Sequence, residues 1–323
     1  MEDIRIALAQ INCPVGDLER NLEKHSQCIH RARDAGAQII CFPETSLTGY
    51  PNTKGLPHDL AQPLEGELTQ SIVEVSAQTG VIVLAGLVER DRSGVIYNTQ
   101  LVASPDGLAG AYRKTHVGNS EIHRFSRGDE LPVFTLAGLT FGIQICYDNH
   151  FPEASRTLAL RGADVIFCPY GSPAPCNEEG MAAKRSRWLR YLPARAFDNS
   201  VYIAVVNQVG QSMEAQPGQT PDTGEKSSTG RDTHVDMPEF PGASMVLNPW
   251  GEMMAEVAAP VEEVLIVDLT AAGLQDKRSD ALQFFTHFRR PELYAELVEP
   301  SRPRLKCLQK PASVPPISSA ALA

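Results

Sequence analysis

Three segments of the chain each end an apolar, strand-like run with a side chain that can do chemistry. The stretch FGIQICYDNHFPEASR places Cys146 after an apolar run and directly before polar residues and a helix start. AQIICFPETS delivers Glu44 in the same way, and LAGAYRKTH delivers Lys114. A thiol at the end of a strand faces ligand and can act as a nucleophile. A thiol, a carboxylate and an ammonium group at the mouth of a sheet predict a site that cleaves amides.

Amide hydrolysis by a thiol needs three groups, and these three residues can supply them. It requires a nucleophile, a proton acceptor, and a positive or hydrogen-bonding site for the oxygen that becomes negative. Cys146 supplies the nucleophile. Glu44 supplies the acceptor, because shielding from water raises the pKa of a carboxyl group toward neutrality. Lys114 supplies the positive charge, which stabilises an oxyanion that exists only in the tetrahedral state.

Short strand-like runs alternate with amphipathic segments, which predicts an α/β layered fold. Several runs are apolar at nearly every position, as expected for strands covered on both faces. The expected strands are IRIALAQI, QIICF, VIVLAGLV, YNTQLVAS, TFGIQIC, DVIFCPY, VYIAVVNQ, SMVLNP and VLIVDL. Helices are expected from Leu18 to Ala35, with Asp17 as the N-cap, and from about Leu68 to Gln78.

Two parts of the chain resemble each other. RDAGAQIICFPETS and ALRGADVIFCPYGS both end a helix at Gly-Ala and then run through an apolar strand into cysteine and proline. Gly36 and Gly162 fit the left-handed position that closes a helix. The similarity predicts two related α-β halves, with the residues after both prolines converging on one cleft. Chance similarity between two βα units is the alternative.

Composition limits the partners of the chain. It has 323 residues and a formal net charge of -10, which disfavours nucleic-acid and anionic-membrane partners because phosphate binding needs a concentrated basic surface. No apolar run reaches membrane-spanning length, and the first residues lack the features of a signal peptide. The seven cysteines contain no C-x-x-C pair, which argues against a disulfide framework or a zinc knuckle. We therefore expect a soluble, cytoplasmic protein.

The chain reads as one domain, because no central linker is convincing enough to divide it. We expect this domain to cover residues 1–299. The polar segment from Gln211 to Glu239 is rich in Gly, Pro, Ser and Thr, which predicts a long loop. Residues 300–323 are rich in proline and small residues, which predicts an extended or disordered C-terminal arm.

Together these segments resemble the nitrilase superfamily of carbon-nitrogen hydrolases, in the branch of amidases and N-carbamoyl-amine hydrolases. The resemblance runs from Ile4 to Tyr294. FPETSLTGY is similar to the family segment with the catalytic glutamate, YRKTH to its lysine segment, and GIQICYDNHFPEASR to its nucleophile elbow. These similarities imply the same roles for Glu44, Lys114 and Cys146. ARAFDNSVYIAVVNQVG and FRRPELY are similar to later landmarks.

The resemblance also implies a fold and a second acid. The family fold is a four-layer α-β-β-α sandwich of two mixed sheets flanked by helices. Its members commonly pair through a helical face, so a homodimer or a larger homo-oligomer is expected. The family often uses a second glutamate between the lysine and the cysteine, and Glu121 in NSEIHRFSRGDE matches it. Glu121 would hold Lys114 and orient the substrate, and Glu130 is the less favoured candidate.

The implied reaction passes through a thioester on Cys146 and releases ammonia or an amine. Lys114 and the backbone N–H of Tyr147 would hold the oxyanion. No metal or other cofactor is expected, because the lysine polarises the carbonyl. The substrate would be a small amide or N-carbamoyl amine. The residues expected by position to line its pocket are Tyr50, Tyr147, Asp148, Tyr170, Ser172 and Asn207.

Other mechanisms and classes stay open. A papain-like Cys-His hydrolase would need a histidine, and His116 and His150 lie close to the proposed site residues. A nitrilase would use the same thiol, but nitrilases of the family usually have a glutamate two residues after it, where this chain has Asp148. A non-catalytic binding or assembly protein on the same fold is the alternative from another class.

One anchoring pattern of the family is missing. The arginines that bind a carboxylate in N-carbamoyl-D-amino acid hydrolases follow soon after the nucleophile, and Asn149 and His150 stand in that region here. Substrates anchored through an α-carboxylate are therefore disfavoured, unless Arg156 or Arg185 takes over that role.

Overall fold

The computed structural model describes residues 1–51, 56–119, 121–212 and 238–299. It divides into two units, residues 1–286 and 287–323. The larger unit contains both sheets and all the expected site residues. The described part of the smaller unit carries short 3-10 turns at Pro291–Leu293 and Ala295–Leu297. The expected domain boundary at residue 299 stays a prediction, because the expected arm, 300–323, lies outside the described residues.

Two six-stranded sheets form the centre of the larger unit. The strands of the first sheet are β1 (Ile4–Gln10), β2 (Ile39–Cys41), β3 (Ile82–Arg90), β4 (Ile96–Ser104), β5 (Gly107–Arg113) and β14 (Glu263–Leu269). Those of the second are β6 (Val133–Leu136), β7 (Leu139–Ile143), β8 (Val165–Tyr170), β9 (Tyr202–Asn207), β12 (Met245–Leu247) and β13 (Met253–Glu256). Their orders are β14-β1-β2-β3-β4-β5 and β13-β12-β9-β8-β7-β6.

Both sheets are mixed in the same way. In the first, β2 pairs in parallel with β1 and with β3, and in the second, β8 pairs in parallel with β7 and with β9. The other neighbours in the two sheets pair antiparallel. The carboxyl ends of parallel strands meet at one edge of a sheet. β2 and β8 therefore bring the segments after them to equivalent edges of the two sheets.

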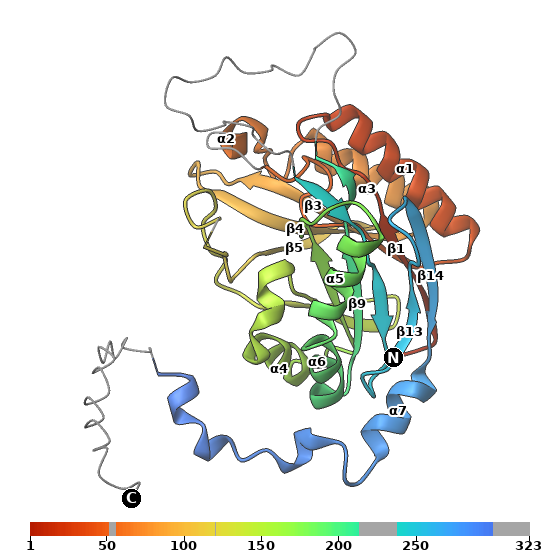
Figure 1. Cartoon of the computed structure of the whole chain (residues 1–323), viewed down its shortest axis with the longest axis vertical. Helices are drawn as coiled ribbons and strands as arrows, with labels where there is room; N and C mark the ends of the chain where they lie inside the picture. The colour runs from red at the N-terminus through yellow and green to blue at the C-terminus, as the bar shows by residue number, and fades with distance from the viewer. Residues whose placement is uncertain (52–55, 120, 213–237, 300–323) are drawn as a thin grey trace, which may run out of the picture. The chain divides into compact units, whose positions relative to one another are not determined.

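Helices cover the outer face of each sheet (Figure 1). The helices of the larger unit are α1 (Leu18–Asp34), α2 (Leu56–Leu60), α3 (Glu67–Thr79), α4 (Pro152–Leu160), α5 (Glu178–Trp188), α6 (Leu192–Asn199) and α7 (Ala271–Ser279). α1 and α3 pack on the first sheet, and α4, α5 and α6 on the second. The Asp17 side chain accepts a hydrogen bond from the backbone N–H of Arg20 and caps α1 as expected.

Three apolar layers hold this arrangement together. Alternate residues of β1 face opposite ways, so that Ile6 and Leu8 join a core between the sheets, while Ala7 and Ala9 join a core under α1 and α3. A third core lies between the second sheet and its helices, around Trp188. The expected four-layer α-β-β-α sandwich is confirmed. Among the described helices, none has the length and apolar character needed to cross a membrane.

Several boundaries differ from the sequence-based expectations. The expected strand TFGIQIC ends at Ile143, and a 3-10 turn, η1 (Cys146–His150), begins at the cysteine. The expected 211–239 loop is shorter at both ends, because β10 (Val209–Gln211) and β11 (Glu239–Pro241) pair as antiparallel strands. Its centre, 213–237, lies outside the described residues. The short strands β6, β10, β11 and β13 and helix α7 were not anticipated.

Candidate active site

Glu44 lies in the turn that follows β2 and has no exposed surface. The turn approaches β3 closely at Gly86, where a Cβ would lie 2.3 Å from the backbone nitrogen of Thr45. Oε1 of Glu44 accepts hydrogen bonds from Lys114 Nζ and Asn98 Nδ2, both at 2.7 Å. Oε2 accepts one from the backbone N–H of Gly171 at 2.6 Å. The carboxylate is therefore held on both oxygens.

The bond from Gly171 joins the two similar segments of the sequence. Glu44 follows the proline after β2, and Gly171 follows Tyr170, the last residue of β8. The preceding helices end at Gly36 and Gly162, whose φ angles of 76° and 95° are left-handed as expected. The residues after the two prolines thus meet at one place, in agreement with the prediction of two converging halves.

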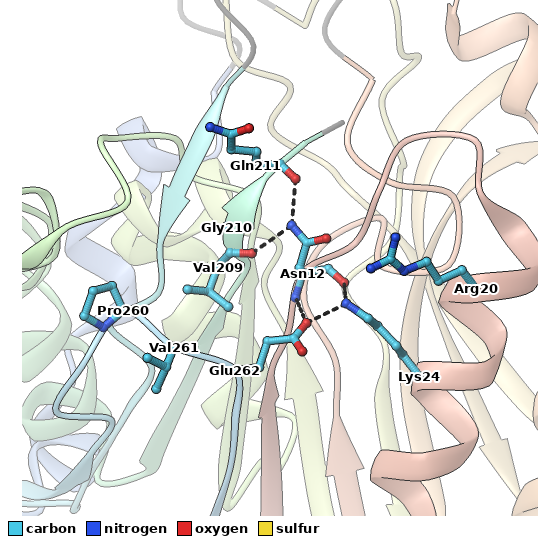
Figure 2. Close-up of a pocket in the computed structure, with 9 residues that line it drawn as sticks. All are labelled: Asn12, Arg20, Lys24, Val209, Gly210, Gln211, Pro260, Val261 and Glu262. Carbon is cyan, nitrogen blue, oxygen red and sulfur yellow. Dashed lines mark hydrogen bonds and ion pairs between the residues drawn. The ribbon is translucent and has the colours of Figure 1, made fainter. Parts of the chain in front are cut away.

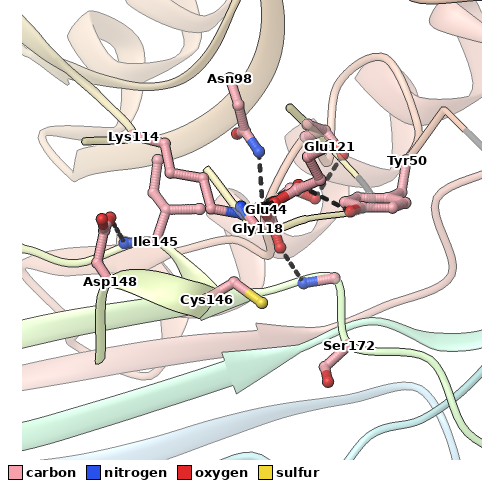
Figure 3. A network of polar contacts seen from close by, with 12 residues as sticks. Glu44, Tyr50, Asn98, Lys114, Gly118, Glu121, Ile145, Cys146, Asp148 and Ser172 are labelled. Carbon is pink, nitrogen blue, oxygen red and sulfur yellow. Dashed lines mark hydrogen bonds and ion pairs between the residues drawn. The ribbon is translucent and has the colours of Figure 1, made fainter. Parts of the chain in front are cut away.

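Lys114 follows β5 directly and is 1% exposed. Its Nζ lies 2.7 Å from Glu44 Oε1, and 3.0 and 2.8 Å from Oε1 and Oε2 of Glu121. Burial alone would lower the pKa of Lys114, but the two carboxylates raise it well above its ordinary value. Lys114 is therefore a permanent cation within a buried cluster of charges (Figure 3).

Glu121 completes this cluster from a turn and is 4% exposed. It accepts hydrogen bonds from the Tyr50 hydroxyl at 2.8 Å and from the backbone N–H of Gly118 at 3.1 Å. Glu121 thus occupies the position expected for the acid that holds Lys114. Glu130, the less favoured candidate, is exposed.

Cys146 is half-buried and opens η1 with a φ angle of 47°, a left-handed conformation that is costly for a residue with a Cβ. Its thiol is hydrogen-bonded to Glu44. Burial is the main cause that raises the pKa of Cys146 well above its ordinary value, and the Glu44 charge adds to it. Burial likewise raises the pKa of Glu44, while Lys114 opposes the shift. The site therefore holds a neutral thiol against a carboxylate that can take its proton.

Asp148 lies in η1 but is not brought to the thiol. Its side chain has no exposed surface. Oδ2 accepts hydrogen bonds from the backbone N–H of Ile145 at 2.9 Å and the Tyr112 hydroxyl at 2.7 Å. Oδ1 accepts them from Thr115 Oγ1 at 3.0 Å and the His116 backbone N–H at 2.8 Å. Asp148 therefore links the turn of Cys146 to the segment that carries Lys114 through hydrogen bonds. It was expected to line the substrate pocket.

The other expected pocket residues divide into two sets. Tyr50 and Tyr147 lie at the charged cluster: Tyr50 bonds Glu121, and the Tyr147 ring, 40% exposed, lies beside Gly118. Tyr170 is buried, its ring against Trp188 and its hydroxyl on that of Tyr191. These contacts favour a packing role for Tyr170.

Ser172 and Asn207 form a linked pair after β8 and β9. Asn207 is fully buried, and its Oδ1 accepts a hydrogen bond from the backbone N–H of Ser172 at 2.9 Å. The Ser172 hydroxyl accepts another from Lys184 Nζ at 2.7 Å. Asn207 therefore holds the backbone that follows Gly171, while Ser172 extends the site toward α5.

The two histidines have partners other than the thiol. His116 Nδ1 lies 2.9 Å from Asp148 Oδ1, and its ring stacks on Phe151. The His150 ring packs against Tyr147 and Tyr191. Neither arrangement is that of a base hydrogen-bonded to Cys146.

Asn98, Gly171 and Lys184 were missed from the sequence. Asn98 is a polar residue inside an otherwise apolar strand, and Gly171 lies after the strand that mirrors β2, so both carried a weak signal. Lys184 lies in the basic run KRSRWLRYLPAR, a pattern that is typical of the polar face of a helix and so gives no signal of a site residue. The expected anchor Arg185 instead pairs with Glu256 at 2.5 Å, and Arg156 is half-buried on α4.

A separate cavity of about 440 Å³ lies next to α1 (Figure 2). Asn12, Lys24 and Glu262 line it, together with Gln211 at the end of β10. Lys24 Nζ already bonds Glu262 Oε1 at 2.6 Å and the Asn12 carbonyl at 3.1 Å. Because its lysine is paired and no thiol lies within it, this cavity is distinct from the Cys146 cluster.

Comparison with known proteins gives a consistent result. The family model described as carbon-nitrogen hydrolase matches residues 5–279. The chain is 32% identical over 294 residues to a nitrilase of Pyrococcus abyssi (strain GE5 / Orsay), covering 90% of this chain and 99% of that one. It is also 32% identical over 278 residues to an (R)-stereoselective amidase of Pseudomonas sp, covering 86% and 89%.

Solved structures show the same fold. A carbon-nitrogen hydrolase from Helicobacter pylori G27 superposes with a TM-score of 0.76 at 21% identity, covering 93% of this chain and 99% of that one. The NitN amidase from Neterenkonia sp. AN1 superposes with a TM-score of 0.69 at 24% identity, covering 91% and 100%. Both share the sandwich described above.

Proposed function

The chain belongs to the carbon-nitrogen hydrolase family, and we propose that it hydrolyses a non-peptide C–N bond in a small amide or N-carbamoyl amine through a thioester on Cys146. The observation that carries this proposal is the buried cluster in which Glu44 contacts both the Cys146 thiol and the Lys114 ammonium. In a hydrolase, a buried base, cation and thiol in contact serve catalysis, whereas a non-catalytic protein gains nothing from burying them together. We therefore do not retain the alternative of a non-catalytic binding or assembly protein.

The first step forms the carbon-sulfur bond. Glu44 accepts the thiol proton as the Cys146 sulfur attacks the carbonyl carbon, and the carbonyl electron pair moves onto oxygen. Lys114 and the backbone N–H of Tyr147 stabilise this oxyanion. Because the two carboxylates keep Lys114 charged, its positive charge is in place before the oxyanion forms.

The second and third steps reuse Glu44. The tetrahedral state collapses, the C–N bond breaks, and the leaving nitrogen takes the proton from the Glu44 carboxylic acid. Ammonia or an amine departs, and the acyl group stays on Cys146 as a thioester. A water then gives its proton to Glu44 and attacks the thioester, which releases the acid, and Glu44 returns the proton to the thiolate.

The surrounding hydrogen bonds support this use of Glu44. A base that accepts and returns a proton must keep its position while its charge changes. Asn98 on β4 and the backbone of Gly171, just after β8, hold the two oxygens of Glu44, so the geometry does not depend on Lys114 alone. Glu121 would act as a positioning residue, since it contacts Lys114 and not the thiol.

Nitrile hydrolysis is the second candidate, because the Pyrococcus abyssi relative carries the name nitrilase. The same thiol and lysine would serve it. We favour amides because Asp148, where nitrilases of the family usually have a glutamate, is engaged behind the turn. A cytoplasmic location and a homo-oligomer stay predictions from the sequence.

Ammonia release from a panel of short-chain amides, N-carbamoyl amines, N-carbamoyl amino acids and nitriles tests the proposal. Cys146→Ala should abolish release. Cys176→Ala is the matched control, since Cys176 is also half-buried but its thiol faces the Pro260 carbonyl. Hydroxylamine should trap the acyl group as a hydroxamate in the parent enzyme only. Ammonia release that persists in Cys146→Ala would overturn the proposal.

A further inference from the structure

Gln208 is a buried side chain that contacts the backbone of the proposed base. It follows β9 directly and is 1% exposed. Its Nε2 donates a hydrogen bond to the backbone carbonyl of Glu44 at 2.8 Å. The Gln208 carbonyl accepts a hydrogen bond from the backbone N–H of Gly242 at 3.0 Å, which holds the backbone from which the side chain extends. Gln208 has no part in the mechanism proposed above.

Gln208 belongs to the sheet that also carries the nucleophile. β7, β8 and β9 are neighbouring parallel strands of the second sheet, so their carboxyl ends meet at one edge. Cys146, Gly171 and Gln208 follow these three strands in turn. Glu44, by contrast, follows β2 of the first sheet. The base and the thiol therefore depend on contacts between the two sheets to stay within hydrogen-bond reach of each other.

The second sheet holds Glu44 at two points. Gly171 donates to the end of its side chain, and Gln208 donates to its backbone carbonyl. The Thr45 hydroxyl also donates to this carbonyl, at 2.8 Å, but it belongs to the same turn and cannot tie the turn to another sheet. Gln208 therefore fixes where the Glu44 side chain begins, and Gly171 fixes where it ends.

The turn that carries Glu44 is strained directly after this residue. Thr45 adopts a φ angle of 51°, a left-handed conformation that is costly for a β-branched residue. Such a conformation persists only where the surrounding structure determines it. From the first sheet, Gln100 Nε2 donates to the Phe42 carbonyl at 3.0 Å and holds the start of the turn. Gln208 holds the turn from the second sheet, one residue before the strained position.

We propose that Gln208 is a positioning residue, which sets the distance between the Glu44 carboxylate and the Cys146 sulfur by tying the Glu44 backbone to the second sheet. This rests on the proposed use of Glu44 as the base. Proton transfer needs donor and acceptor within about 3 Å of each other, and a misplacement of about 1 Å can cost about 100-fold in rate. Losing the Gln208 bond therefore slows removal of the thiol proton.

Gln208→Met removes the donor with almost no change of volume. The first turnover of ammonia release, which reports thioester formation, should slow about 10- to 100-fold on the amide that the parent enzyme hydrolyses fastest. Alkylation of Cys146 by iodoacetamide, followed by mass spectrometry of its peptide, should also slow, because only the thiolate reacts. Gln208→Asn is a second variant in case Gln208→Met does not fold. It keeps the amide group but is one carbon too short to reach the carbonyl, so both rates should fall.

Gln10→Met is the matched control. Gln10 is also a fully buried glutamine, but its Nε2 donates to the Val261 carbonyl at 2.9 Å and its Oε1 accepts from the Ser244 N–H at 3.0 Å. Gln10→Met should lower the free energy of unfolding in urea, because it leaves the Ser244 N–H without its acceptor. Its first-turnover rate and its Cys146 alkylation should stay near those of the parent enzyme.

A double variant shows whether Gln208 acts through Glu44. In the Glu44→Gln protein the base is already gone, so adding Gln208→Met should change the first-turnover rate little further. A general structural loss would instead lower the rate by the same factor with and without Glu44. The cycle therefore separates positioning of the base from a loss of folding.

The outcomes separate the inference from the function on which it rests. Equal losses of rate in Gln10→Met and Gln208→Met would overturn the inference, as would equal losses from Gln208→Met with and without Glu44. A rate like that of the parent enzyme in the folded Gln208 variants would also overturn it. In these cases amide hydrolysis through Cys146 would stand. If ammonia release persists in Cys146→Ala, the proposed function fails instead.

Discussion

Replacing Glu44 with glutamine tests the general base with almost no change of shape. The carboxylate accepts hydrogen bonds from Lys114 and Asn98 on Oε1, and from Gly171 on Oε2. Glutamine has one acceptor oxygen and one donating NH₂ group. Whichever way the amide turns, its NH₂ group faces at least one buried N–H donor. The variant therefore loses the base and leaves a donor without its acceptor.

The size of the effect follows from these two losses. Removing a general base costs roughly 10²- to 10⁴-fold in rate. Leaving a buried donor unsatisfied costs about 1–3 kcal/mol of folding stability. Lys114 keeps both oxygens of Glu121 as acceptors, so the protein should stay folded. We expect kcat/KM for amides to fall at least about 100-fold in Glu44→Gln.

Glu121→Gln is the matched control for charge. It removes a carboxylate from the same lysine, but Glu121 has no hydrogen bond to the thiol among the described contacts. Its kcat/KM should fall less than that of Glu44→Gln. Ammonia release and hydroxylamine trapping measure both variants, and chemical denaturation checks that each is folded.

The pH profile gives a second measurement on Glu44. Burial raises its pKa above the ordinary value of a glutamate. The reactive form needs Glu44 ionised, so kcat/KM should decline as the pH falls through this raised pKa, at a higher pH than for an exposed glutamate. A folded Glu44→Gln variant that keeps kcat/KM within about threefold of the parent would refute the assignment and favour a histidine base.

Three further substitutions test the elements around the site. Asp148→Ala should lower the free energy of unfolding by about 3–5 kcal/mol, because it leaves the buried donors that converge on this carboxylate without an acceptor; urea denaturation measures this, and Asp148→Asn should lose less. Gly171→Ala should lower kcat/KM at least tenfold with little change in secondary structure, because a Cβ there would lie 2.7 Å from the Tyr50 ring and 3.2 Å from Glu44 Oε2; unchanged kinetics would contradict the placement of Glu44. Cys146→Gly should have a free energy of unfolding about 1 kcal/mol higher than that of Cys146→Ala, because only glycine adopts φ 47° without strain. Its urea midpoint should therefore be higher, and equal midpoints for the two variants would show that the turn relaxes.

The strands that carry the site were predictable because their sequences are locally unambiguous. IRIALAQI, QIICF and DVIFCPY are apolar along their whole length, as strands covered on both faces must be, and they form β1, β2 and β8. The nucleophile turn was less predictable. TFGIQIC continues the apolar pattern to Cys146, but the Ile145 N–H bonds Asp148 Oδ2 instead of a neighbouring strand. The side chain of Asp148, three residues after Ile145, therefore ends the expected strand before it reaches Cys146.

The roles of the polar residues near the motifs depended on the tertiary structure. Asp148 and Tyr170 lie close to the site in sequence and were expected in the pocket, yet both face inward to buried partners. Lys184 lies in a basic run typical of a solvated helix face, yet on α5 its Nζ donates a hydrogen bond to Ser172. Sequence position places such residues within a turn of the site, but the direction of each side chain follows from packing.

The sequence by itself determined the chemistry that this chain can perform. Glu44, Lys114 and Cys146 each follow a strand or strand-like run, and their types supply a base, a cation and a nucleophile. Only the tertiary structure decided how these groups are paired and which further residues join them. The contacts that decide this join residues far apart in the chain, such as Glu44 with Asn98, and the pattern of neighbouring residues carries no information about such pairs. Burial then sets their charges, because desolvation depends on the layers that close over the site.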